Sequence, residues 1–372
     1  MDNTDRRTFL KTTALASAAV AAGSTTSALA ADAPLTLGLV GCAHIHTPGF
    51  TKLLAEQKNV RVKWAWDKDP ARVAKWGGVV GAKTASSAAE IFGDPEVKAV
   101  VILSETNAHR ELVAQATAAK KHLFAEKPLG TNGPESREMA AAIEKAGLLF
   151  TTGYFMRTDP KHLFLREQVA KGAFGKITHA AAWNCHQGSL GGWFDDKPGN
   201  VAESWRWMAD PKVAGVGAFG DLGTHSLDIL MWVLGPVEAV TADIRIVTNR
   251  YPGCDETGTA LLRMGDGLGA ALTAGWVDVA NPVTLQIAGT EGHALIVNDQ
   301  LFFESKKVPG SKMKEPVAAL PPAPKAPMLQ WLDAVSGAAG QPLVTPSEAA
   351  ARVAVMDAAY ASARDGHWTK VV

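Results

Sequence analysis

The sequence predicts an α/β protein in which a doubly wound parallel sheet is followed by an α+β domain with a large, mostly antiparallel open sheet. Two patterns support this fold class. Between residues 33 and 153, short apolar runs alternate with helical segments, as they do where helices cover both faces of a parallel sheet. From Ile177 onward, extended runs are separated by Gly, Asp and Asn turns, which predicts antiparallel strands.

The length of the chain indicates more than one domain, because 372 residues exceed what one hydrophobic core usually serves. We expect the first domain at residues 33–153 and the second at residues 154–325. Five prolines between Pro316 and Pro327 mark an extended connector. Residues 326–372 then form a C-terminal helical segment that we expect to pack back on the body of the protein.

Residues 1–30 have the pattern of a twin-arginine export signal. Arg6 and Arg7 precede an apolar, alanine-rich run that ends in a small-x-small cleavage pattern at residues 28–30. A membrane anchor is the weaker alternative, because polar residues and a glycine interrupt the run. We therefore expect a periplasmic protein that is exported in its folded state and loses residues 1–30.

In the first domain, helix signals separate five predicted strands. Pro48 and Pro134 each suit the first turn of a helix, and Gly147 suits the end of the second of these helices. Asn107 can cap a helix that runs to Lys120. The predicted strands are residues 35–40, 60–66, 99–103, 122–125 and 148–152.

In the second domain, extended apolar runs predict the open sheet. The final helix is expected at residues 347–365, with Ser347 as its cap and Gly366 as its stop. The predicted strands are residues 177–183, 237–247, 257–264, 269–273 and 282–288.

The turn after the first strand indicates a dinucleotide site. Residues 41–46 read Gly-Cys-Ala-His-Ile-His where the Rossmann fingerprint would read Gly-x-Gly-x-x-Gly. The first glycine is kept, Ala43 still allows the backbone to approach a pyrophosphate, and the following helix terminus offers amides to it. Cofactor contacts are expected from Gly41, Ala43, His44 and Ile45.

Asp67, at the end of the second strand, is placed to accept hydrogen bonds from a ribose diol. Its charge would repel a 2′-phosphate and so favours NAD, although the neighbouring Lys68 leaves NADP open. Cys42, His44 and His46 alternate in the turn, yet no carboxylate or further cysteine nearby in sequence completes a ligand set. We therefore expect no metal there.

Charge and cysteine content exclude several classes of partner. The chain has 37 basic and 37 acidic residues, so no net field favours nucleic acid or an anionic membrane surface. Its three cysteines are widely spaced, and they indicate neither a disulfide framework nor a zinc site.

Two further segments point to a catalytic centre. Asp221 and His225 lie four residues apart in a predicted helix, where side chains on one face meet. Glu126-Lys127-Pro128 ends an apolar strand. Together these segments resemble the catalytic motifs of the Gfo/Idh/MocA family of nicotinamide-dependent sugar and polyol oxidoreductases.

This resemblance implies that Lys127, Asp221 and His225 surround the carbon that exchanges hydride. His225 would take the hydroxyl proton, Lys127 would donate to the same oxygen, and Asp221 would orient the histidine or an adjacent hydroxyl. The loop at residues 104–109 resembles the family loop beside the nicotinamide ribose. The implied cofactor contacts are Ser104, Glu105, Asn107, His109, Glu126 and Lys127.

Tryptophans and arginines in the second domain suggest how substrate is bound. Flat aromatic faces beside hydrogen-bonding groups suit a sugar ring, although tryptophans can equally fill an irregular core. Arg206 would also suit an acidic sugar. The substrate contacts we expect are Arg157, Trp183, Trp205 and Arg206.

The function implied is hydride transfer between a carbohydrate or polyol carbinol and a tightly held NAD(P), as in the related glucose-fructose oxidoreductase and inositol dehydrogenase. An NAD-retaining, redox-neutral glycoside hydrolase is one alternative, and a non-enzymatic sugar-binding or scaffold protein is another. The resemblance also implies a homodimer or homotetramer that associates through the open sheet.

Overall fold

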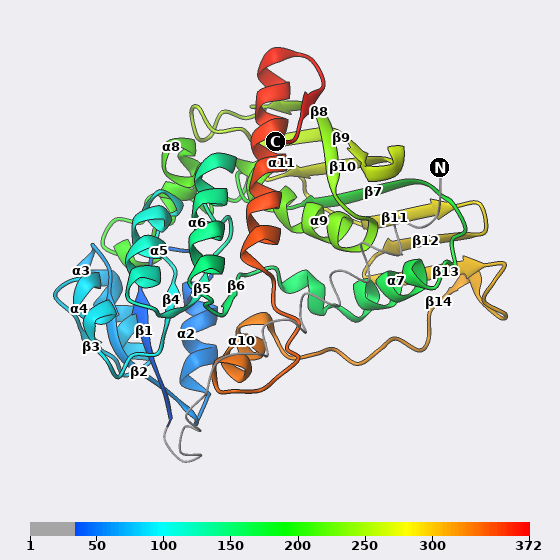
Figure 1. The fold of residues 1–372 in the computed structure, drawn as a ribbon. Coiled ribbons are helices and arrows are strands. Elements are labelled where there is room, and N and C mark those ends of the chain that lie inside the picture. Colours follow the sequence, from blue (N-terminus) through cyan, green and yellow to red (C-terminus); the bar gives the residue numbers. More distant parts are fainter. Residues whose placement is uncertain (1–33) are drawn as a thin grey trace.

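The computed structural model describes residues 34–372 (Figure 1). The predicted export signal and its cleavage site lie outside these described residues. Within residues 34–372, no helix combines the length and apolar character needed to cross a membrane. The three cysteines, Cys42, Cys185 and Cys254, are unpaired.

A six-stranded parallel sheet forms the first half, with strand order β3-β2-β1-β4-β5-β6. This is the doubly wound order, in which the chain changes direction between β1 and β4 and leaves a crevice at their carboxyl ends. The strands are β1 (Leu35–Val40), β2 (Val60–Trp66), β3 (Lys83–Thr84), β4 (Ala99–Ile102), β5 (His122–Ala125) and β6 (Phe150–Thr151).

Helices cover both faces of this sheet because alternate side chains of its strands point to opposite sides. Val100 belongs to the core that includes residues of α4, α5 and α6, whereas Val101 belongs to the core that includes residues of α2 and of the later helix α10 (Pro327–Val335). The helices of this half are α2 (Thr47–Ala55), α3 (Pro70–Arg72), η1 (Val73–Gly77), α4 (Ala88–Gly93), η2 (Thr106–Ala108), α5 (His109–Ala118) and α6 (Gly133–Lys145).

The five predicted strands of this half are present, whereas the short strand β3 was not predicted, and one helix start needs correction. Asn107 does not cap α5: it lies in the short turn η2, and the N-cap of α5 is Ala108, without a side-chain cap. In the next helix, α6, the N-cap does have a side-chain hydrogen bond, because Asn132 accepts from the amide of Glu135.

A nine-stranded sheet forms the second half, with order β14-β13-β12-β11-β7-β10-β9-β8-β15. It is antiparallel throughout, except that β7 and β10 pair in parallel. The strands are β7 (Ile177–Cys185), β8 (Val237–Arg245), β9 (Thr257–Met264), β10 (Gly269–Gly275), β11 (Val283–Gly289), β12 (Gly292–Val297), β13 (Gln300–Ser305), β14 (Lys312–Pro316) and β15 (Thr369–Lys370).

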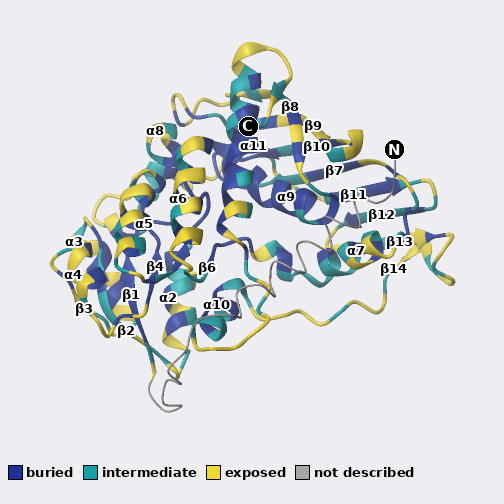
Figure 2. Ribbon diagram, in the orientation of Figure 1, coloured by how far each residue is buried: buried dark blue, intermediate teal, exposed yellow. Residues whose placement is uncertain are grey.

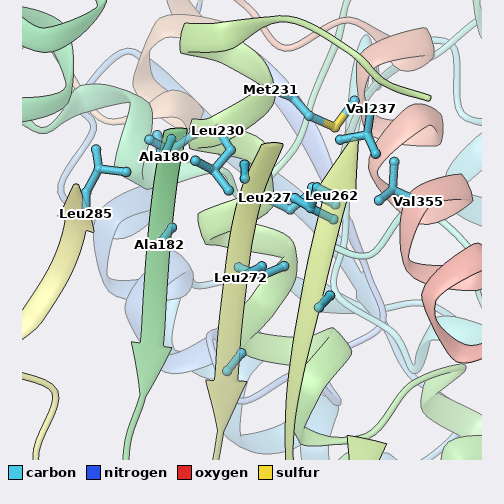
Figure 3. Close-up of a cluster of buried hydrophobic side chains, with 14 of the residues drawn as sticks. Ala180, Ala182, Leu227, Leu230, Met231, Val237, Leu262, Leu272, Leu285 and Val355 are labelled. Carbon is cyan, nitrogen blue, oxygen red and sulfur yellow. The ribbon is translucent and has the colours of Figure 1, made fainter. Parts of the chain in front are cut away.

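One face of this sheet is covered by the helix α9 (Ala218–Leu234), and side chains of the two interdigitate there (Figure 3). Ala182 and Leu272 are buried from the sheet side, and Leu227 and Leu230 from the helix side. The other helical segments of this half are η3 (Phe155–Thr158), α7 (Pro160–Ala170), η4 (Val201–Glu203), η5 (Arg206–Ala209), α8 (Pro211–Ala214) and η6 (Gly265–Gly267).

The C-terminal helices connect the two halves. α10 (Pro327–Val335) covers the parallel sheet, and α11 (Pro346–Asp365) packs against α6 in the first half and β8 in the second (Figure 1). The predicted cap of α11 was wrong by two residues, because Thr345 forms the capping box with Glu348. Gly366 ends the helix in the left-handed conformation, with φ of 74°, as predicted.

A buried ion-pair network fastens α9, which is buried along almost its whole length (Figure 2), to α11. Asp228, 1% exposed, accepts from Arg157 Nε at 2.8 Å and from Arg157 Nη2 at 2.6 Å. Arg352 Nε also donates to Asp228, at 2.9 Å, and Glu348 pairs with Arg157 at 3.0 Å. Two buried guanidinium groups therefore depend on one carboxylate.

Neutralising Asp228 should lower the free energy of unfolding by about 3 kcal/mol, because two buried arginines lose the carboxylate that they share and only Glu348 is left to pair with them. The substitution Asp228→Asn keeps the shape of the side chain and removes its charge. Asp243→Asn is the matched control, since Asp243 also accepts two hydrogen bonds from one arginine, Arg245, but on the surface. Denaturant unfolding measures both variants, and equal losses would contradict a special role for the buried network.

Candidate active site

Lys127 and Asp221 form a buried ion pair where the two halves meet. Lys127 follows β5 and is 2% exposed, and its ammonium donates to Asp221 Oδ1 at 2.8 Å. The other carboxylate oxygen accepts from Trp276 Nε1 at 3.3 Å. Burial alone would raise the pKa of Asp221, but the Lys127 charge and hydrogen bond hold it at about 2. Asp221 is therefore ionised at neutral pH.

The position of Asp221 depends on how α9 begins. Gly217 is the N-cap and has no side chain to satisfy the first amides of the helix. Asp255 Oδ2 accepts from the Phe219 amide at 2.8 Å, and the Tyr360 hydroxyl accepts from the Gly217 and Gly220 amides at 3.0 and 3.1 Å. A β-carbon at Gly217 would lie 2.2 Å from Asp255 Oδ1, so glycine is required there.

His225 lies one turn after Asp221 on α9 and is 3% exposed. Its ring contacts Tyr154 and Phe155, with centroids 6.0 and 4.9 Å away, and its Nδ1 has no hydrogen-bond partner among the described residues. Burial, followed by the Lys127 charge, lowers the pKa of His225 well below its ordinary value. The imidazole is therefore neutral at pH 7 and has an uncommitted nitrogen.

Two roles were predicted for Asp221, to orient His225 or to orient an adjacent hydroxyl, and the contacts in the structure bear on the first. No hydrogen bond joins Asp221 to His225 within residues 34–372, because the carboxylate is occupied by Lys127 and Trp276. Asp221 therefore positions the lysine rather than the histidine. The charge of Lys127 lowers the pKa of Asp221 and also that of His225.

The turn between β1 and α2 is held tightly against the next loop. Gly41 has φ of 81°, and a β-carbon there would lie 2.5 Å from the Ser104 amide. The amides of Ala43 and His44 both donate to the Leu103 carbonyl, at 2.9 and 3.0 Å. Among the described residues the Ile45 amide has no partner, so it can donate to a phosphate oxygen beside the α2 terminus.

Trp207, from the second half, packs on the turn between β1 and α2. Trp207 Nε1 donates to the Ala43 carbonyl at 2.9 Å, and its ring lies 5.9 Å from that of His44. Trp76 Nε1 likewise donates to the Ala202 carbonyl, at 3.0 Å. The segment around residues 201–209 is thereby fixed to the first half.

Asp67 lines a cavity of about 260 Å³ beside Gly41 and Ser104. Its Oδ2 accepts from the Cys42 amide at 2.6 Å, and burial raises its pKa. A carboxylate oxygen with further lone pairs faces a space bounded by the glycine turn, so the site fits the adenosine end of a dinucleotide.

Glu105 lines the same cavity but already has two cationic partners, Arg72 at 2.8 Å and Lys68 at 2.9 Å. Asn107 lies outside this cavity: it is exposed and lines a separate hollow with Arg110. His109 is buried and its Nδ1 contacts the Leu129 carbonyl at 3.1 Å, beneath the loop that follows Lys127. Neither Asn107 nor His109 therefore lines the cavity that contains Asp67.

Glu126 is fully buried at the centre of the site. Its Oε1 lies 2.5 Å from His46 Nδ1 and 3.7 Å from His44 Nδ1, and its Oε2 accepts from the Lys127 amide at 2.6 Å. Burial lowers the pKa of His44 to about 3, against the attraction of Glu126. A β-carbon at Gly153 would lie 2.2 Å from Glu126 Oε2, so the carboxylate rests directly on backbone.

Two of the predicted substrate residues, Trp183 and Arg157, lie away from the Lys127–Asp221 pair. Trp183 alternates with Ala182 and Asn184 on β7, and Asn184 donates to the Leu222 carbonyl of α9. Trp183 therefore faces the open side of the sheet, away from α9, because successive side chains of a strand alternate. Arg157 is committed to Asp228 and serves the buried network instead of a ligand.

Trp205 and Arg206 are in the loop that reaches the first half, and both have partners of their own. The Lys197 ammonium lies 4.6 Å from the Trp205 ring, and the Arg206 guanidinium lies 4.9 Å from the Tyr251 ring. The Nη1 atom of Arg206 is buried without a partner among the described residues. Their role in substrate binding stays a prediction.

Sequence reasoning missed several residues of the site. Trp276 follows a strand end and gave no signal, although it is fully buried and bonds Asp221. His186 packs on Trp193 with ring centroids 4.5 Å apart, and the charges of Asp221 and Lys127 influence its pKa, which burial lowers. The alternating histidines of the turn were noticed, but not their contact with Glu126.

Comparison with known protein families now identifies the chain. Residues 35–154 match the oxidoreductase family with an NAD-binding Rossmann fold, and residues 162–295 match the GFO/IDH/MocA C-terminal domain. The two matches follow one another along the chain and fall on its two halves. The chain belongs to the Gfo/Idh/MocA oxidoreductase family.

Similar Gfo/Idh/MocA proteins are named as dehydrogenases and reductases. Levoglucosan dehydrogenase from Pseudarthrobacter phenanthrenivorans is 29% identical over 211 residues, 54% of this chain and 49% of that protein. Myo-inositol 2-dehydrogenase from Thermotoga maritima is 31% identical over 187 residues, 48% and 49% of the two chains. The chain thus spans about half the length of the curated relatives it matches.

Solved structures share the fold over nearly the whole chain. The WlbA dehydrogenase from Bordetella pertussis, in complex with NADH and UDP-GlcNAcA, has a TM-score of 0.75 at 20% identity. Levoglucosan dehydrogenase with NADH and levoglucosan has a TM-score of 0.72 at 21% identity. Each covers 91% of this chain and 99% of the other. The predicted fold class is confirmed.

The depressed pKa of His225 should make stability depend on pH. An unfolded histidine takes up a proton near about pH 6.5, whereas the folded one does so only at lower pH. The folded state therefore loses stability as the pH falls below about 6.5, by up to about 1.4 kcal/mol per pH unit. His225→Gln should flatten this slope in urea unfolding series. The exposed His179→Gln is the control, and equal slopes in all three proteins would contradict the assignment.

Asp67 should set the preference between NAD and NADP. Asp67→Asn keeps an oxygen for the Cys42 amide and removes the charge, so the ratio of NAD to NADP affinity should fall roughly tenfold. Titration calorimetry with both cofactors measures the ratio. Asp69→Asn, which changes a nearby carboxylate that caps α3, should leave it unchanged. An unaltered ratio in the Asp67 variant would show that this carboxylate does not contact the ribose.

Proposed function

We propose that this Gfo/Idh/MocA protein is an NAD-dependent oxidoreductase that transfers hydride between NAD and a carbinol of a carbohydrate or polyol. The observation that carries this proposal is a neutral buried histidine with a free nitrogen beside a buried lysine–aspartate pair. Such a base can accept a hydroxyl proton next to a cation that stabilises the resulting alkoxide.

The chain's residues fit a dinucleotide. Gly41 and the free Ile45 amide would receive the pyrophosphate, Asp67 the adenosine ribose, and Glu126 the nicotinamide ribose. When bound, NAD supplies the hydride acceptor at its nicotinamide carbon. The carboxylate of Asp67 supports NAD over NADP, although Lys68 and Arg72 lie close to it.

The proton steps belong to His225 and Lys127. His225 accepts the substrate hydroxyl proton, and the Lys127 ammonium donates a hydrogen bond to the oxygen that becomes negative. Asp221 holds that ammonium in place by accepting its hydrogen bond. All three groups are at most 9% exposed, so water cannot weaken these electrostatic interactions.

The relatives support a sugar or polyol as substrate. Levoglucosan dehydrogenase and myo-inositol 2-dehydrogenase are both named for such compounds. Trp205 and Arg206 are our candidates for contacting the sugar, as the sequence suggested. Neither the hydrolase nor the scaffold alternative is favoured by relatives named as dehydrogenases and reductases.

We further infer export of the folded, NAD-loaded protein to the periplasm, on the basis of the twin-arginine pattern alone. Self-association through the open sheet is also part of the proposal. Trp183 lies on that face, and Leu261 of β9 is 53% exposed. Light scattering measures the molar mass in solution, and a comparison of the protein with a Leu261→Lys variant would test the self-association.

His225→Ala and Lys127→Ala should each slow single-turnover reduction of bound NAD by roughly 10²-fold or more, because each removes one partner of the same proton transfer. Their combined effect should be far from additive. Stopped-flow absorbance of NADH measures the rates. His179→Ala is the control, and a double variant with the wild-type rate would contradict the mechanism.

A substrate panel tests the reaction class. We expect free sugars or polyols to give NADH together with a keto-sugar or lactone, detected by absorbance and mass spectrometry. Cleavage of aryl glycosides with no net NADH would instead support the redox-neutral hydrolase. Binding of sugars with no NADH and no cleavage would support the scaffold protein.

A further inference from the structure

The geometry of His44, His46 and Glu126 points to a binding site for a divalent transition-metal ion, which goes beyond the proposed function and does not depend on it. One ligand atom from each residue lies within 4.8 Å of the other two. Two imidazoles and one carboxylate are donors that suit zinc, cobalt or iron(II) better than magnesium or calcium. Three protein ligands also leave coordination positions open for water or another molecule.

The three groups already contact one another through hydrogen bonds. His46 Nδ1 bonds Glu126 Oε1 at 2.5 Å, and His44 Nδ1, which accepts from the His46 amide at 3.2 Å, lies 3.7 Å from the same carboxylate oxygen. A metal ion would take the place of the proton between His46 Nδ1 and Glu126 Oε1. Because an imidazole nitrogen has one lone pair, His44 Nδ1 would have to exchange the His46 amide for the metal.

Charge balance gives a second, independent argument. Glu126 is 0% exposed, and within residues 34–372 its ion-pair partners are the histidines His46, at 2.5 Å, and His44, at 3.7 Å, with no lysine or arginine among them. The neighbouring Lys127 ammonium is bonded to Asp221 at 2.8 Å. Buried carboxylates are usually paired with a cation or bound to a metal, because an isolated buried charge is costly.

The surroundings hold the carboxylate in one orientation. Its second oxygen accepts from the Lys127 amide at 2.6 Å and lies against the backbone of Gly153. Outer contacts of this kind orient metal ligands in known sites. His46 has a side chain that is 37% exposed, so an ion can reach the cluster from solvent.

Sequence analysis expected no metal here because no carboxylate stands near the turn. The structure supplies one from the end of β5, 80 residues away from His46 along the chain. His46 also takes the third-glycine position of the dinucleotide fingerprint, so the departure from that fingerprint and the proposed metal ligand are the same residue.

Cobalt(II) is the probe for the experiment, because its visible absorption reports the ligands around the ion. The full-length protein is treated with chelator, then titrated with CoCl2, both with NAD present and after NAD removal. We expect one ion per chain with imidazole-ligand absorption in at least one of these states. His46→Phe and Glu126→Gln should each weaken binding by at least about tenfold, given that outer-shell changes alone cost 10–100-fold.

His293→Phe is the matched control, a half-buried histidine on β12 whose loss should leave the titration unchanged. Circular dichroism verifies folding, and if one ligand variant fails to fold, the other carries the comparison. Binding that is absent in both states of the wild type, or equal in the wild type and a folded ligand variant, would overturn the proposal. Nitrogen NMR showing a His46 imidazolium that stays protonated in excess CoCl2 would do so as well.

Discussion

The buried ammonium of Lys127 is the constraint around which the two halves are arranged. A lysine that is 2% exposed needs an anion at hydrogen-bonding distance, and the only one that bonds it within the described chain comes from the other half, at Asp221. The end of β5 and the first turn of α9 must therefore meet. Trp276 donates to the second oxygen of the Asp221 carboxylate. Asp255 and Tyr360 accept hydrogen bonds from the first amides of α9 and so fix the position of that first turn.

The same arrangement explains why His44 and His225 are uncharged. Desolvation disfavours the protonated imidazole of both residues, and the lysine charge adds to this effect. An uncharged base next to a fixed ammonium suits alcohol oxidation. The two carboxylates of the site differ in their partners, because Asp221 is paired with a lysine and Glu126 with histidines.

Sequence patterns predicted the parallel sheet nearly strand by strand, because buried strands with short helical crossovers leave strong local signals. Asp221 and His225 were predictable for the same local reason, being one turn apart. That Trp183 lies on the open face of β7 was not predictable, since the alanines at 180 and 182 do not reveal which face of the strand is buried. The ion-pair partners of Arg157 and Glu126 were harder still to predict. Their partners are Asp228, 71 residues away, and His46, 80 residues away, and no local pattern encodes such pairings.

The two C-terminal helices contribute to all three hydrophobic cores found within residues 34–372. Trp331 fills one side of the parallel sheet, Val353 fills the other, and Met356 belongs to the core beneath the nine-stranded sheet. During synthesis on the ribosome, none of these cores can be completed until residues 328–359 have emerged from the exit tunnel. Until then, the apolar surface that these helices cover in the folded protein stays exposed.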